Sequence, residues 1–123
     1  MKLTSALRET LAAAIITAAG SNPKMKYYTG TESLTPAGTL LATLTITGAL
    51  GTSSGGVINY NETVTQSSGS HVAGTPAFIL ITTSADVAVC TLLLGGTDGT
   101  STPIATGVNV SIDVPATITV GNA

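Results

Sequence analysis

In the segment Leu40–Thr47, the apolar residues Leu40, Ala42, Leu44 and Ile46 alternate with Leu41, Thr43, Thr45 and Thr47. Successive side chains of a β-strand point to opposite faces of the sheet. The pattern therefore predicts a strand with an apolar face toward a core and a hydroxyl-bearing outer face. A chain built from such segments is constrained to form a sheet that buries one side and presents neutral threonines on the other.

Further strand candidates follow along the chain, separated by turns rich in Gly, Ser, Thr and Pro. They are Met25–Thr29, Leu40–Thr47, Val57–Tyr60, Glu62–Gln66, Ala77–Thr83, Val87–Leu94, Val108–Val114 and Thr117–Val120. Residues 48–56 are predicted to be a flexible loop, and the two most hydrophobic strands, 77–83 and 87–94, are placed in the middle of the sheet. About seven or eight such strands predict a mainly β fold, an antiparallel β-sandwich or a jelly-roll-like domain.

One N-terminal α-helix is expected before the sheet. An apolar stripe recurs every four residues and is widened by two alanines; its members are Leu3, Leu7, Leu11, Ile15, Ala14 and Ala18. Thr4 or Ser5 can cap the start, and Gly20 supplies a stop. We therefore divide the chain into an amphipathic docking helix in residues 1–20 and a β-sandwich in residues 24–123.

The same N-terminal segment has a second interpretation as a secretory leader. Lys2 gives a basic start, and residues 11–19 form a short apolar region. Arg8 and Glu9 interrupt the apolar pattern, which favours a structural helix. A region of nine residues is also too short to span a membrane, so no membrane partner is expected.

Charged side chains are unusually scarce. They make up 8% of 123 residues, whereas soluble domains average roughly 25%. The formal net charge is −2, so the chain lacks the basic footprint of a nucleic-acid-binding protein. A weakly charged surface also offers little repulsion between copies, which favours self-association.

Few side chains could carry chemistry. The single histidine, His71, lies in a polar Gly/Ser stretch and is expected to be an exposed loop residue. Six acidic residues are spread singly and do not give metal-ligand spacing. The only cysteine, Cys90, lies in an apolar run and is predicted to be a buried small hydrophobe. We therefore expect a non-enzymatic protein with no catalytic residue, cofactor, metal or small-molecule substrate.

The three tyrosines are Tyr27, Tyr28 and Tyr60. Packing in a core or at an interface is the favoured interpretation. Stacking on single-stranded nucleic acid, helped by the neighbouring Lys24 and Lys26, is the alternative.

Several short segments, in order along nearly the whole chain, resemble a family of small structural proteins encoded by tailed bacteriophages. They are residues 1–8, Tyr27–Gly30, Gly38–Thr45, Gly56–Val57, Ala77–Leu80, Val108–Ile112 and Thr117–Thr119. The resemblance implies a virion component with no catalytic residues, assembled in the cytoplasm of a bacterial host. Its partners would be copies of itself and other virion proteins, at the head surface, the neck or the tail.

Two other functions remain open: a carbohydrate-binding or adhesion module, and a secreted or fimbrial structural subunit. The first would use exposed aromatic side chains, and the second would have a cleaved leader. For the leading hypothesis, a set of apolar and aromatic residues is the candidate subunit interface. They are Leu3, Leu7, Leu11, Ile15, Tyr27 and Tyr28.

Overall fold

The computed structural model describes residues 2–95, 104 and 117–119. One helix, α1 (Ser5–Ala19), precedes eight strands. The strands are β1 (Lys24–Tyr28), β2 (Leu40–Ile46), β3 (Gly51–Ser54), β4 (Val57–Tyr60), β5 (Val64–Gln66), β6 (Phe78–Thr82), β7 (Ala88–Leu93) and β8 (Thr117–Thr119). A short 3-10 turn, η1 (Ser68–Ser70), follows β5. The predicted class, mainly β with an N-terminal helix, is confirmed. The predicted strand at 108–114 lies outside the described residues.

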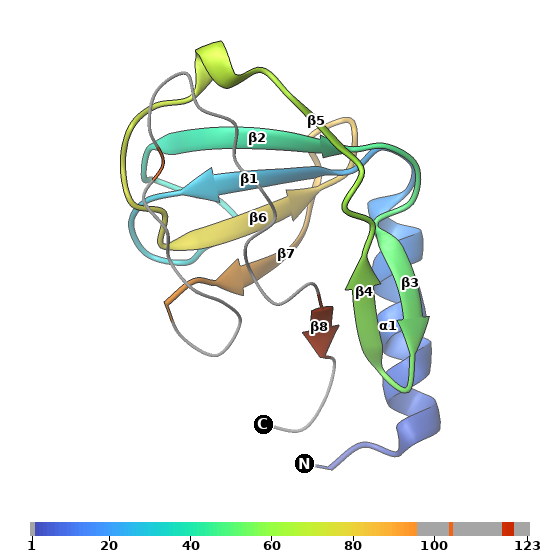
Figure 1. The fold of residues 1–123 in the computed structure, drawn as a ribbon. Helices are drawn as coiled ribbons and strands as arrows, with labels where there is room; N and C mark the ends of the chain where they lie inside the picture. Colours follow the sequence, from blue (N-terminus) through green and yellow to red (C-terminus); the bar gives the residue numbers. More distant parts are fainter. Residues whose placement is uncertain (1, 96–103, 105–116, 120–123) are drawn as a thin grey trace.

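The strands form two antiparallel sheets in a sandwich-like arrangement. The larger has the order β5-β2-β1-β6-β7, and the smaller has the order β3-β4-β8. Figure 1 shows α1 running alongside the β3–β4 hairpin, at one end of the larger sheet. The main core lies on one face of the larger sheet, and Leu50 and Tyr60, from the side of the hairpin, join it.

The alternation in β2 is confirmed with one shift. Ala42, Leu44 and Ile46 are buried as predicted. Leu40 is 38% exposed and Leu41 is buried instead, because the pairing with β1 passes from Ala42 to Leu40 and leaves Leu41 as an extra residue. Such a bulge reverses the facing of the side chains at the strand end.

Two sequence predictions about strands are wrong. The expected flexible loop at 48–56 contains β3, which pairs with β4 across a turn at Gly55 and Gly56. Both turn glycines have positive φ, 60° and 86°, and glycine pairs of this kind favour tight hairpins. The hydrophobic run of β7 lies at the edge of the larger sheet rather than in its middle.

The helix ends where the sequence predicts. The Thr4 side chain accepts a hydrogen bond of 3.2 Å from the backbone N–H of Leu7. Gly20 adopts φ 69° and donates its N–H to the carbonyl of Ile16. These caps satisfy backbone groups at both helix ends, and packing of the helix against the domain supplies the rest of its stability.

Candidate interaction surfaces

The helix α1 turns its leucines outward. Leu7 is 45% exposed and Leu11 is 39% exposed, whereas Ala12 and Ala19 are fully buried. Ile15 packs against the core, and Leu3 is half-buried. The predicted stripe is therefore split: Leu7 and Leu11, in its middle, face away from the domain, whereas Leu3 and Ile15, at its two ends, are half-buried.

Small and polar residues determine which side of α1 faces the domain. The Glu9 carboxylate accepts hydrogen bonds from the Ser53 hydroxyl at 2.5 Å and from the Gly56 backbone N–H at 2.9 Å. These two bonds hold the pKa of Glu9 below its ordinary value. Ala12 and Ala19 lie on this inward side, where a larger side chain would hold the helix farther from the hairpin.

The tyrosines of the candidate interface do not form an exposed patch. Tyr27 is 4% exposed and belongs to the core, so its assignment to the interface is wrong. Tyr60 is also buried. Tyr28 is half-buried and stacks on Phe78, with ring centroids 5.7 Å apart and an interplanar angle of 15°. Alternation along β1 explains the difference, because Tyr27 and Tyr28 point to opposite faces of the sheet.

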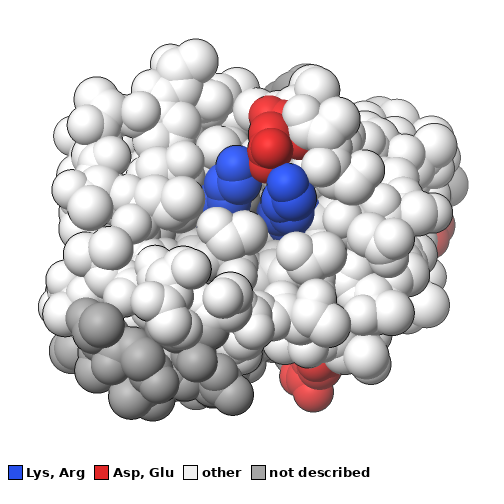
Figure 2. All heavy atoms as spheres, turned by 90° about the horizontal axis from the view of Figure 1, so that it is seen from above, with Lys and Arg blue, Asp and Glu red and all other residues white. Residues whose placement is uncertain are grey.

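The opposite face of the larger sheet carries threonines and two lysines. The register places Lys24 opposite Thr45 and Lys26 opposite Thr43. Figure 2 shows basic and acidic side chains gathered side by side on a face that is otherwise mostly uncharged. Thr43 and Thr45 lie on this face as predicted, but both are half-buried, and Phe78 and Leu80 of β6 are buried on the same face.

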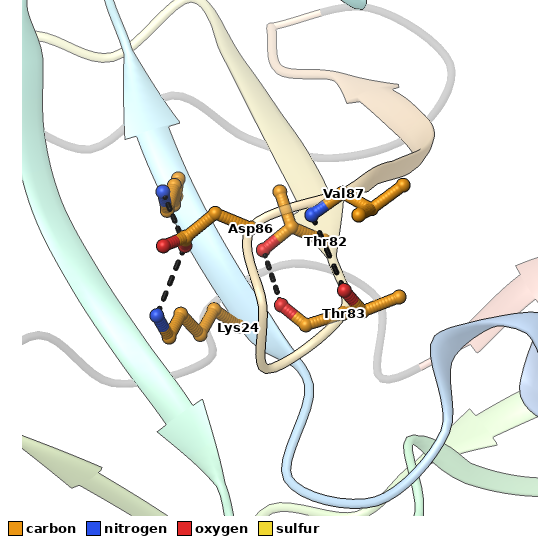
Figure 3. Close-up of polar contacts among 6 residues, drawn as sticks. Lys24, Thr82, Thr83, Asp86 and Val87 are labelled. Atoms are coloured by element: carbon orange, nitrogen blue, oxygen red, sulfur yellow. Dashed lines mark hydrogen bonds and ion pairs between the residues drawn. The ribbon is translucent and has the colours of Figure 1, made fainter.

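The lysines are bound within the chain. Asp86 Oδ1 lies 2.9 Å from Lys24 Nζ and 2.7 Å from Lys26 Nζ. Figure 3 shows Asp86 reaching from the β6–β7 turn to Lys24 on β1. Hydrogen bonding from Lys26, and then from Lys24, keeps the pKa of Asp86 below its ordinary value.

Local geometry in the turn positions this aspartate. Asp86 has φ 66°, in the left-handed region that aspartate tolerates better than most residues. Its N–H donates to the Thr83 carbonyl at 3.0 Å, and the Val87 N–H donates to the Thr83 hydroxyl at 3.2 Å. Through Asp86, the two lysines connect β1 to the β6–β7 turn. The lysine side chains are 17–25% exposed.

An open groove of about 510 Å³ lies beside β2, β5 and the segment that follows β5. Apolar surface makes up the larger part of its lining and includes Leu40, Leu41 and Ala42; the polar residues are Thr43, Thr45, Thr65, Gln66, Ser67, Ser70 and His71. His71 is 3% exposed, so the prediction of an exposed loop histidine is wrong. The segment bends back onto β2, where the Val72 N–H donates to the Leu41 carbonyl at 2.9 Å.

No arrangement for catalysis or metal binding stands out among the described residues. In this part of the chain no group of three or more His, Cys, Asp or Glu side chains is placed to hold a metal ion. Cys90 packs against the core, and burial raises the pKa of its thiol to about 11. Such a thiol is a poor nucleophile near neutral pH.

Comparison of the chain with protein-family models, with curated proteins and with solved structures gave no match. Within the described ranges, no helix has both the length and the apolar character needed to cross a membrane.

Proposed function

We propose that this chain is a non-enzymatic structural component of a tailed-bacteriophage virion, a head decoration, neck or tail accessory protein. It works through repeated contacts with copies of itself and with neighbouring virion proteins. The observation that carries the proposal is the outward side of α1, where Leu7 and Leu11 are exposed and no charged residue lies between Thr10 and Gly20. The resemblance in sequence supplies the virion context.

The physical argument rests on desolvation. A surface helix of a soluble monomer normally carries charged residues on its outer face, whereas α1 directs Glu9 inward to the hairpin. Burying the exposed parts of Leu7 and Leu11 at a contact would contribute roughly 1 kcal/mol for each side chain. The only charged residues of α1 are Glu9, which the hairpin binds, and the half-buried Arg8, so desolvation of ionised groups takes away only part of this gain.

A carbohydrate-binding function receives less support. Binding sites for sugars in such sandwiches use exposed aromatic rings, and Tyr27 and Tyr60 are buried. Tyr28 has its ring stacked on Phe78. Among the described residues, the groove beside β5 is lined by no Tyr, Phe or Trp side chain that could serve as an aromatic platform.

Mass spectrometry of purified particles tests the proposal. We expect the chain in many copies per particle when the virus that encodes it is grown and banded. Particles that assemble and infect normally without the chain, and that never contain it, would refute the virion assignment.

A variant series then tests the surface. Leu7→Glu combined with Leu11→Glu should reduce incorporation at least about tenfold, because two carboxylates would be buried without partners. Ala13→Lys is the matched control, because Ala13 is exposed on the other flank of the same helix. Circular dichroism establishes that both variants fold, and equal incorporation of the two would contradict the assignment of this surface.

A further inference from the structure

The exposed stripe on α1 has the spacing of a helix–helix contact. Leu7, Leu11, Ala14 and Ala18 are separated by four, three and four residues, which is the a/d spacing of a heptad. The two leucines are large exposed hydrophobics, and both alanines are exposed. These four residues, the α1 stripe, lie on one side of the helix, away from the inward Ala12 and Ala19.

Mostly uncharged residues flank the α1 stripe. Thr10 and Thr17 are exposed on one side of it, and the half-buried Arg8 lies on the other side, three residues before Leu11. Helices that lie on membranes usually carry Lys and Arg along the polar face next to their apolar residues. Arg8 is the single cation of α1, so the occupant that suits this surface is another apolar protein surface with little charge.

The α1 stripe is complementary in size to itself. Consider an antiparallel copy related by a two-fold axis that crosses the helix at the level midway between residues 12 and 13. Leu7 then lies opposite Ala18, and Leu11 lies opposite Ala14. Each large side chain then meets a small one, which allows close packing without voids. A parallel copy would instead place leucine against leucine at one end and alanine against alanine at the other.

We propose that α1 pairs antiparallel with α1 of a second copy of this chain through the α1 stripe. This inference deepens the proposed function, on which it rests, by naming the partner. Two-fold interfaces of this kind use the same patch on both subunits.

The small area of this contact limits how tightly two copies can bind. A helix of 15 residues is roughly 22 Å long and about 10 Å across. It covers much less than the roughly 800 Å² per partner typical of a stable complex. The isolated chain should therefore dimerise weakly, and many such contacts in one particle would add to each other through high local concentration.

Sedimentation velocity of the full chain, at concentrations up to about 1 mM, tests the pairing. We expect concentration-dependent dimers. Ala14→Lys should raise the dimer dissociation constant at least about tenfold, since a lysine at such a position destabilises helix pairing. Ala13→Lys, an identical change at the adjacent exposed alanine, should alter it less than about twofold.

Disulfide crosslinking tests the direction, in a Cys90→Ala background that removes the native thiol. A mixture of Leu7→Cys chains and Ala18→Cys chains should form a disulfide-linked heterodimer under mild oxidation. Either variant alone should not crosslink, because an antiparallel pair separates the two copies of residue 7 by roughly 16 Å along the axis, too far for a disulfide.

The outcomes separate the two proposals. Crosslinking of Leu7→Cys with itself would overturn the antiparallel pairing. A chain that stays monomeric at every concentration, or equal effects of Ala14→Lys and Ala13→Lys, would overturn the self-pairing. If that chain is still found in purified particles, the virion assignment stands and another virion protein covers the α1 stripe.

Discussion

Replacing Leu44 with alanine should expose how much of the stability depends on the alternation in β2. Leu44 is fully buried, lies opposite Met25 on β1 and pairs with Gln66 on β5. The substitution removes three carbon groups, each worth about 0.8 kcal/mol when buried. The transfer loss is thus roughly 2.4 kcal/mol, and the remaining cavity raises it to about 3 kcal/mol or more.

The adjacent residue supplies the control. Thr45 points to the outer face and is half-buried, so Thr45→Ala should cost less than about 1 kcal/mol. Domains of this size have a total free energy of unfolding of about 5–15 kcal/mol. Leu44→Ala should accordingly lower the melting temperature by on the order of 10 °C.

Urea unfolding followed by circular dichroism measures both changes. Low protein concentration is needed, because association of folded chains would add stability by mass action. A cost below about 1 kcal/mol for Leu44→Ala, or equal costs for the two variants, would refute the facing of β2 and with it the neutral outer face.

Three further predictions concern the hairpin, the thiol and the helix contact. Gly51→Ala should destabilise the β3–β4 hairpin, because the new Cβ would collide with the Asn59 carbonyl; Gly69→Ala, in open space, should leave the urea midpoint nearly unchanged. Cys90 should react with iodoacetamide at about pH 8 roughly a hundredfold more slowly in the folded than in the unfolded chain, because its pKa is raised to about 11; equal rates would contradict its burial. Glu9 has a folded pKa below its ordinary value, so its contribution to stability is present above that ordinary value and is lost as the pH falls through the folded pKa. Glu9→Gln should therefore flatten the acid side of the profile of unfolding free energy against pH, measured between about pH 5 and pH 2. An unchanged profile would contradict the lowered pKa.

The ends of α1 could be predicted from the sequence, whereas the side that it turns toward the domain could not. Its caps at Thr4 and Gly20 depend on local hydrogen bonds, so local residues were sufficient to predict them. Its orientation depends on the surface it meets. The large leucines dominated the sequence pattern, yet close approach to the hairpin selected the small Ala12 and the hydrogen-bonding Glu9.

The sheet shows the same division between local and long-range information. The alternation in β2 could be seen in the sequence because every second residue from Ala42 to Ile46 faces the buried core. β3, with the sequence Gly-Thr-Ser-Ser, has no apolar alternation and becomes a strand through its pairing with β4. The Gly55–Gly56 pair was the local signal for that hairpin. Burial of His71 depends on the return of its segment to Leu41, and no local pattern encodes that return.

Five of the charged side chains that the structure describes connect separate elements of the fold: Glu9, Lys24, Lys26, Glu32 and Asp86. Asp86 joins β1 to the β6–β7 turn through two lysines, and Glu9 joins α1 to the hairpin. Glu32 accepts a hydrogen bond from the Thr91 hydroxyl at 2.6 Å. The ion pairs of Asp86 with the two lysines neutralise part of the charge that would otherwise keep copies of the protein apart. Because the remaining outer surface relies on hydroxyl and apolar groups, contact between copies should depend on burial and shape, with little of the salt dependence of charged interfaces.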